Sequence, residues 1–266
     1  MRQRADILLF SRGLSPSRDK ARALILAGRV YSGERRVDKA GEQLPDDAPL
    51  SVRGEDLRYV SRGGLKLEGA LTDFALSPQG LVAADFGAST GGFTDCLLQH
   101  GAMRVFAIDV GYGQLDHRLR IDPRVHVMER TNARHLVAGD LAEPVDWVVI
   151  DASFIGLEKL LPAAAKILKP EGQVLALVKP QFQVGRREAA RSAGVIRDEG
   201  LRIQAIDQVA ADASSLGFAE RARSDAAIKG PKGNQECFLW LTLRPSAERG
   251  VPVDPSGARE GGFEPP

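Results

Sequence analysis

Short apolar segments alternate with helical patterns through the middle of the chain, at residues 81–86, 104–109, 126–129, 146–151 and 173–179. A helix is expected over residues 156–170, between the last two of these segments. Short β-forming runs separated by helices are typical of a parallel sheet that is buried on both faces. The sequence therefore predicts a mostly parallel, doubly wound α/β domain.

Charged side chains stand at the ends of four of these segments: Asp85, Asp109, Asp151 and Lys179. The carboxyl ends of parallel strands meet at one edge of a sheet, and ligands of doubly wound sheets bind beyond that edge. A single aspartate in such a place is more often a helix cap or a turn residue. Four charged groups at one edge indicate a binding site.

The loop after the first segment reads Asp-Phe-Gly-Ala-Ser-Thr-Gly-Gly over residues 85–92. Its glycines allow the backbone to approach a ligand, and the following helix offers free N–H groups. The glycine spacing departs from the dinucleotide fingerprint, and Asp85 beside it suits a cationic ligand. Asp109, placed after the second segment, can accept hydrogen bonds from ribose hydroxyls. Together these features favour S-adenosylmethionine over NAD, although the glycine spacing alone is a weak signal.

Charge is unevenly distributed along the chain. The whole protein has 36 Lys or Arg against 35 Asp or Glu, a balance that argues against a polyanionic partner. Residues 1–40, however, hold ten basic and four acidic side chains, whereas residues 41–60 hold two basic and five acidic ones. A basic patch of this size can attract nucleic acid by releasing counterions. The alternative interpretation is an ordinary solvated helical surface.

The order of residues within the basic segment predicts a compact module of two short helices and a small hairpin. Ser15 or Ser17 can cap the second helix, and Gly28 suits its end. Arg18 and Arg22 are four residues apart and therefore share one helix face, away from the apolar residues. Arginines would thus gather on one side of the module.

Residues 4–41 resemble the S-four-type RNA-binding domain, a small α+β fold. The resemblance implies that the segment grips structured RNA through its phosphates and shape. The residues that would do so are Arg4, Arg12, Arg18, Lys20, Arg22 and Arg29.

The residues near the strand ends narrow the reaction that a methyltransferase of this sequence could perform. Asp151-Ala152-Ser153-Phe154 lacks the paired prolines typical of amine-directed enzymes. Methylation at a pyrimidine carbon needs a nucleophilic cysteine, and neither cysteine is well placed because they lie within a predicted helix and a predicted strand. An oxygen nucleophile remains, and a lysine can accept or steer its proton. The candidate side chains are Lys66, Asp151, Lys179 and Glu236. Taken singly, each could equally be a surface or strand-end charge.

Several motifs, in this order, resemble the TlyA family of ribosomal RNA 2′-O-methyltransferases: SRGGLKLEGAL, DFGASTGGFTDCLL, AIDVGYGQL, ERTNARHL, VIDASFIGL, LVKPQFQVG and GNQECFLWL. The resemblance covers about residues 4–243 and implies a catalytic domain similar to the FtsJ methyltransferases, with a Rossmann-like class I sheet. It also implies a catalytic tetrad of Lys66, Asp151, Lys179 and Glu236. The implied S-adenosylmethionine-binding residues are Asp85, Gly87, Ala88, Ser89, Gly91, Gly92, Asp109 and Asn132.

The family further implies a cytidine ribose in ribosomal RNA as the substrate and ribosomal subunits as partners. We expect an RNA-binding domain at residues 1–58, a methyltransferase domain at 59–245 and a disordered tail at 246–266. Residues 183–194 and 228–234 are expected to form loops that close on RNA, with ordinary solvated loops as the alternative.

The remaining expectations concern the setting of the protein. Cys96 and Cys237 lack the spacing of metal ligands or of a disulfide framework, so we expect no metal and a reducing, cytoplasmic setting. The sequence does not specify the oligomeric state, and a monomer is the default. A non-catalytic RNA-binding or ribosome-assembly protein is the main alternative. Some family members carry the name haemolysin, but no apolar run approaches the 18 residues that a membrane span requires, so direct membrane lysis is disfavoured.

Overall fold

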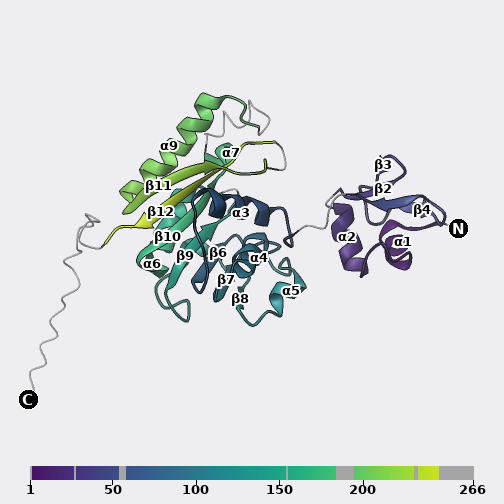
Figure 1. Ribbon diagram of the computed structural model, residues 1–266, viewed down its shortest axis with the longest axis horizontal. Coiled ribbons are helices and arrows are strands. Elements are labelled where there is room, and N and C mark those ends of the chain that lie inside the picture. The colour runs from purple at the N-terminus through teal and green to yellow at the C-terminus, as the bar shows by residue number, and fades with distance from the viewer. Residues whose placement is uncertain are drawn as a thin grey trace, which may run out of the picture. The chain divides into compact units, whose positions relative to one another are not determined.

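The computed structural model describes residues 2–26, 28–53, 58–153, 155–183, 195–230 and 233–245. The chain divides into two compact units, Met1–Leu57 and Arg58–Pro266 (Figure 1). The tail expected at 246–266, most of the loop expected at 183–194 and residues 231–232 of the second loop lie outside the described residues.

The first unit is the small α+β module that the sequence predicts. Its two helices are α1 (Ala5–Ser11) and α2 (Arg18–Leu26). Its strands form two small antiparallel sheets, β1 (Arg2–Arg4) with β4 (Gln43–Pro45), and β3 (Arg35–Arg36), β2 (Val30–Ser32) and β5 (Leu50–Val52) in that order.

Local signals in the sequence set the limits of α2. The hydroxyl of Ser17, not that of Ser15, accepts the backbone N–H of Lys20 at 3.1 Å and so caps the helix. Gly28 follows the helix with a φ of 68°, a left-handed conformation that favours glycine. Leu24 and Ile25 are buried in the core of the unit, as their spacing predicts.

The second unit is built around a seven-stranded sheet in the order β11-β12-β10-β9-β6-β7-β8. The five parallel strands are β6 (Val82–Phe86), β7 (Arg104–Ile108), β8 (Val125–Met128), β9 (Val145–Ile150) and β10 (Leu168–Val178). From β6 the chain runs outward to β7 and β8, then returns to the other side of β6 as β9. The strand order therefore reverses between β6 and β9, which is where such sheets bind ligands.

Two antiparallel strands complete the sheet at one side. These are β11 (Phe218–Asp225) and β12 (Cys237–Leu243), and β12 lies between β11 and β10. The pairing of Val178 with Cys237 is the last in the β10–β12 ladder, so the end of β10 lies beside the start of β12.

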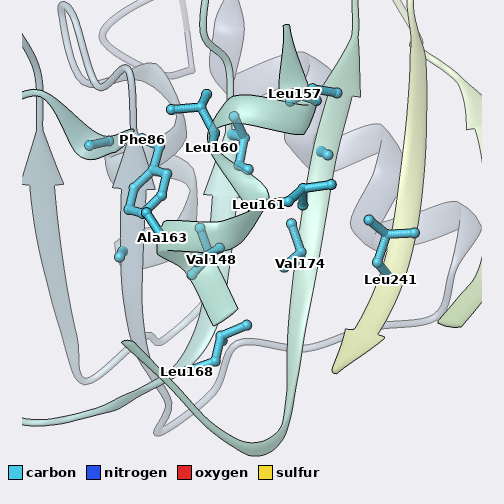
Figure 2. Close-up of a cluster of buried hydrophobic side chains, with 14 of the residues drawn as sticks. Phe86, Val148, Leu157, Leu160, Leu161, Ala163, Leu168, Val174 and Leu241 are labelled. Carbon is cyan, nitrogen blue, oxygen red and sulfur yellow. The ribbon is translucent and has the colours of Figure 1, made fainter. Parts of the chain in front are cut away.

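Helices cover both faces of the sheet (Figure 1). One face packs against the 3-10 turn η2 (Leu157–Lys159), α6 (Leu161–Ile167) and α9 (Glu199–Ser215), and Figure 2 shows part of this core. The other packs against α3 (Gly63–Asp73), α4 (Gly92–Gln99) and α5 (His117–Arg120). Burial on both faces explains why polar and apolar residues do not alternate along the parallel strands.

The expected helix over residues 156–170 is wrong in its extent. The η2 turn precedes α6, which ends at Ile167, and Leu168 already pairs with Val145 of β9. The register of β10 against β9 then shifts between Leu168 and Gln173. This irregularity lets the chain turn directly from the helix into the long strand.

We expect Leu161→Ala to lower the free energy of unfolding of the second unit by about 2–5 kcal/mol, because it leaves a cavity in a well-packed core. Leu161 is fully buried among the side chains of Figure 2. Ile203→Ala, on the exposed side of α9, is the control and should change stability by less than about 0.5 kcal/mol. Urea denaturation measures both values, and equal effects of the two variants would contradict the packing described here.

Candidate functional site

A pocket of about 480 Å³ opens at the carboxyl edge of the sheet, where the strand order reverses. The ends of β6, β7 and β9 and the segment after β8 form its walls. The lining residues are Phe86, Gly87, Ser89, Ile108, Asp109, Val110, Gln114, Thr131, Asn132, Ala133, Asp151, Ala152, Ser153, Ile155 and Leu160.

The loop after β6 winds tightly around the floor of this pocket. Gly87 has a φ of 86°, and a side chain there would place its Cβ 3.0 Å from the carbonyl oxygen of Asp151. Ser89 also has a positive φ, of 48°, which is uncommon for a residue with a side chain. The close approach of this loop to the end of β9 therefore requires glycine at position 87.

The other two glycines of the loop serve packing and do not line the pocket. Gly91, at the start of α4, lies against the side chains of Leu115 and Leu119. A Cβ on Gly92 would come within 3.0 Å of the backbone nitrogen of Gly64 in α3. Gly92 thus allows the starts of α3 and α4 to lie in direct contact, and Gly91 makes room for the two leucines.

Asp109 fixes the shape of the pocket wall with its carboxylate. One oxygen accepts the backbone N–H of Ser89 at 2.8 Å, and the other accepts that of Gly111 at 2.7 Å. A carboxylate offers about four acceptor positions, so both oxygens retain capacity for ligand hydroxyls. This arrangement suits the ribose-binding role expected of Asp109.

Asp85 precedes the pocket residue Phe86 but does not itself line the pocket. Its side chain is fully buried and one oxygen accepts both the N–H and the hydroxyl of Thr94, at 3.0 and 2.7 Å. Burial raises the pKa of Asp85 to about 7, against the lowering effect of the Thr94 hydroxyl, and the charges of Asp151 and Asp109 add to the rise. Its other oxygen has no partner among the described residues. Ala88 also lies outside the pocket wall.

Two lysine–carboxylate pairs stand at the same edge of the sheet; the first is buried in both partners, and in the second the Asp151 side chain is 23% exposed. Lys66 Nζ of α3 lies 2.6 Å from Glu236 Oε2, and Lys179 Nζ lies 2.5 Å from Asp151 Oδ1. Lys66, Lys179 and Glu236 are all less than 10% exposed. Burial of charges is costly unless they are paired, so each pair holds its members in place.

The strand register brings the two pairs together. Lys179 follows Val178 and Glu236 precedes Cys237, the last paired residues of β10 and β12. The start of α3 reaches the same place, since a Cβ on Gly63 would lie 3.8 Å from Asp151 Oδ2. The four residues expected to form a tetrad thus form two pairs, Lys66 of α3 with the residue before β12, and the residues that follow β9 and β10 with each other.

Lys179 also contacts Ser153, a pocket residue to which the sequence analysis gave no role. The ammonium lies 3.0 Å from the Ser153 hydroxyl and 3.4 Å from the backbone oxygen of Asp151. Gln114 is a second missed pocket residue, and its side chain accepts the Ser89 hydroxyl at 3.3 Å. The motif AIDVGYGQL contains Gln114, but nothing in its spacing shows that it turns toward the glycine loop.

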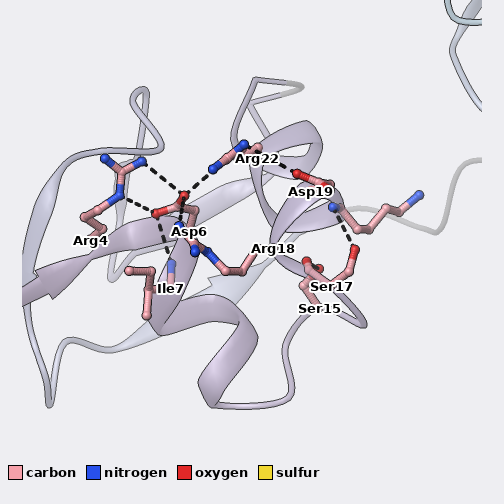
Figure 3. Close-up of polar contacts among 9 residues, drawn as sticks. Arg4, Asp6, Ile7, Ser15, Ser17, Arg18, Asp19 and Arg22 are labelled. Atoms are coloured by element: carbon pink, nitrogen blue, oxygen red, sulfur yellow. Dashed lines mark hydrogen bonds and ion pairs between the residues drawn. The ribbon is translucent and has the colours of Figure 1, made fainter. Parts of the chain in front are cut away.

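The basic residues expected to bind RNA have different local partners in the first unit. Arg4, Arg18 and Arg22 converge on the carboxylate of Asp6 (Figure 3). Arg12 donates to the backbone oxygens of Ala48 and Asp46, and Arg29 donates to that of Arg53. Lys20 is exposed on α2.

Two negative findings apply to the part of the chain that the structure describes. No helix there is long and apolar enough to cross a membrane. No group of three or more His, Cys, Asp or Glu side chains there is arranged to hold a metal ion.

Known families match both units. The FtsJ-like methyltransferase model matches residues 59–243, and the S4 domain model matches residues 3–48. The 16S/23S rRNA (cytidine-2'-O)-methyltransferase TlyA of Mycobacterium tuberculosis is 44% identical over 241 residues, which cover 90% of each chain. Hemolysin A of Brachyspira hyodysenteriae is 38% identical over 90% of this chain and 100% of that protein.

Solved structures agree with the fold. A protein described as a hemolysin from Streptococcus thermophilus is 42% identical, with a TM-score of 0.73 over 95% of this chain and 92% of that one. A methyltransferase structure from Listeria monocytogenes shares the fold at 15% identity, with a TM-score of 0.51 over 69% of this chain and 100% of that one.

The ionisation of Asp85 should make stability depend on pH. Because its pKa is raised in the folded protein, the unfolded chain releases this proton first as the pH rises above about 4. The unfolding free energy of the wild type should therefore fall by about 1–4 kcal/mol relative to that of Asp85→Asn between about pH 4 and pH 7, with no further change above.

Urea denaturation of both proteins across this pH range measures the difference. Parallel curves would show that Asp85 is already ionised in the folded protein near pH 5, contrary to this expectation.

Proposed function

The chain belongs to the FtsJ-like methyltransferase family, and on that premise we propose that it methylates the 2′-hydroxyl of a cytidine ribose in ribosomal RNA. S-adenosylmethionine is the proposed methyl donor. The names of its TlyA relatives support the substrate class.

The pocket suits this donor by shape and charge. Asp109 retains acceptor positions for ribose hydroxyls, while Ile108 and Val110 beside it offer an apolar wall for a base. Asn132 and Thr131 line the part of the pocket that follows β8, where the adenine is proposed to lie. The carboxylate of Asp85 is buried outside the pocket wall, and a cationic ligand in the pocket would favour the ionised form of this carboxylate.

The observation that carries the proposal is the pair of lysine–carboxylate contacts beside the pocket. Asp151 and Ser153 belong to the pocket wall and both contact Lys179, so the ammonium lies at the border of the ligand space. A group in that position can reach a hydroxyl brought next to a bound donor. A purely structural ion pair would not need to face a pocket.

In the proposed mechanism, Lys179 orients the 2′-hydroxyl and takes up its proton. The Lys179 ammonium donates hydrogen bonds to the Asp151 carbonyl and to the Ser153 hydroxyl, and it forms an ion pair with Asp151 Oδ1. An incoming ribose hydroxyl replaces one of these contacts, and the longest, at 3.4 Å, is the easiest to lose. Lys66 and Glu236 hold the adjoining wall in place.

S-adenosylmethionine, when bound, supplies an electrophilic methyl group on a sulfonium sulfur. The ribose oxygen would take this methyl group as the carbon–sulfur bond breaks. Lys179 would first release one ammonium proton to solvent, so that its free amine can accept the hydroxyl proton. Asp151 then stabilises the resulting ammonium at Nζ.

The first unit is proposed to capture the RNA. Its S4 domain match and its excess of basic residues support this role. We propose that residues 1–58 capture RNA and that residues 59–245 transfer the methyl group, in a monomeric cytoplasmic protein. A non-catalytic RNA-binding protein is the alternative that the following experiment excludes.

Transfer of radiolabelled methyl from S-adenosylmethionine to purified bacterial ribosomal subunits, followed by mapping of the modified ribose, tests the function. We expect Lys179→Ala to slow methyl transfer by about 100-fold or more, because the group that orients the 2′-hydroxyl and accepts its proton is lost. The affinity for S-adenosylmethionine should be unchanged.

Lys169→Ala provides a matched control. Lys169 also pairs with an aspartate, Asp146 at 2.7 Å, but at the opposite end of β10 from the pocket. Full activity of Lys169→Ala together with an active Lys179→Ala would overturn the assignment of Lys179. Absence of methyl transfer by the wild type would overturn the proposed methyltransferase activity.

A further inference from the structure

The strongest charge cluster outside the pocket centres on Asp6 in the first unit (Figure 3). Its side chain is fully buried, yet it belongs to a short helix of a unit rich in exposed arginines. Arg4 binds it through two nitrogens, with Nε 3.0 Å from Oδ1 and Nη2 3.1 Å from Oδ2. Arg22 Nε lies 3.2 Å from Oδ2, and Arg18 Nη2 lies 3.6 Å from the same atom.

These three arginines come from different parts of the unit. Arg4 ends β1, whereas Arg18 and Arg22 stand one turn apart on α2. Asp6 itself lies on α1, where the backbone N–H of Ile7 also donates to its carboxylate at 3.1 Å. One carboxylate on α1 therefore fixes the relative positions of cations that two other elements, β1 and α2, carry.

The arginines keep their outer surfaces open to solvent despite these contacts. Their side chains are 42–47% exposed. A guanidinium has five N–H groups, and Asp6 occupies two of those on Arg4 and one on Arg22. The remaining donors can bind phosphate oxygens, which match the planar geometry of a guanidinium.

The cluster around Asp6 contains more positive than negative groups. One buried carboxylate faces three guanidinium groups, so a positive excess remains after Asp6 has offset part of their repulsion. The bonds to the arginines hold the pKa of Asp6 at about 2, so it stays ionised at neutral pH. Long side chains that are fixed before binding lose less conformational entropy when a ligand arrives.

We propose that Asp6 is a positioning residue for RNA binding, which holds Arg4, Arg18 and Arg22 as one preformed phosphate-binding surface. The ligand is the sugar–phosphate backbone of folded RNA. This inference rests on the proposed function, because it assigns the way in which the first unit grips the RNA.

Asp6→Asn and Asp19→Asn in the full-length protein separate positioning from charge. Asp19 also contacts Arg22, at 3.4 Å, but its side chain is 92% exposed and it contacts neither Arg4 nor Arg18 in the contacts described above. Each substitution removes one negative charge from the same cluster. Charge alone would therefore strengthen RNA binding equally in both variants.

Binding to purified large ribosomal subunits over a range of KCl concentrations is the measurement. We expect Asp6→Asn to weaken binding by about five-fold or more. The slope of the logarithm of the binding constant against the logarithm of the KCl concentration should become shallower by about one to two, as expected for the loss of one to two phosphate contacts. Asp19→Asn should bind as tightly as the wild type or more tightly. The proposal is overturned if Asp6→Asn binds as Asp19→Asn does.

Asp6→Glu keeps the charge and displaces the carboxylate by one methylene group, so it provides a second test if Asp6→Asn unfolds the first unit. We expect weaker RNA binding with an unchanged circular dichroism spectrum, whereas wild-type affinity and salt slope would overturn the proposal. S-adenosylmethionine affinity should be unaffected in every variant. These binding measurements do not depend on methyl transfer, so failure of the enzymatic proposal and failure of this one are distinguishable.

Discussion

The buried contact between Lys66 and Glu236 is the constraint on which the rest of the candidate site depends. It joins α3, at the beginning of the second unit, to the residue before β12, near the end of that unit. Removal of either partner would leave an unpaired buried charge, a change that typically costs several kcal/mol. The pair therefore keeps α3 against the start of β12. Lys179 follows the end of β10, which lies beside that start.

The glycines of the pocket loop make this arrangement possible. Gly92 lets α4 begin directly beside Gly64, so α3 can lie against the same sheet edge. Gly87 brings the loop to the carbonyl of Asp151, whose side chain holds Lys179. The pocket wall and the two lysine–carboxylate pairs are thus parts of one packed arrangement.

The sequence predicts the parallel strands well, because each is an apolar run with clear punctuation, and Asp151 and Lys179 follow two of these runs directly. It does not show that Asp85 faces α4, since strands buried on both faces carry no alternation that distinguishes one face from the other. The sequence analysis also missed β11, where charged residues interrupt the apolar pattern. The convergence of Arg4 on Asp6 beside Arg18 and Arg22 is a tertiary contact, which helical spacing cannot reveal.

The order of elements along the chain has a consequence for biosynthesis. Every parallel strand of the sheet is complete once residue 178 has been made, but Lys66 has no Glu236 to pair with until 58 further residues are added. Until then β10 also lacks its neighbour β12 and remains an open sheet edge. A nascent chain can therefore assemble the pocket loop early, while the buried charge pair beside the site forms only after residue 236 has been made.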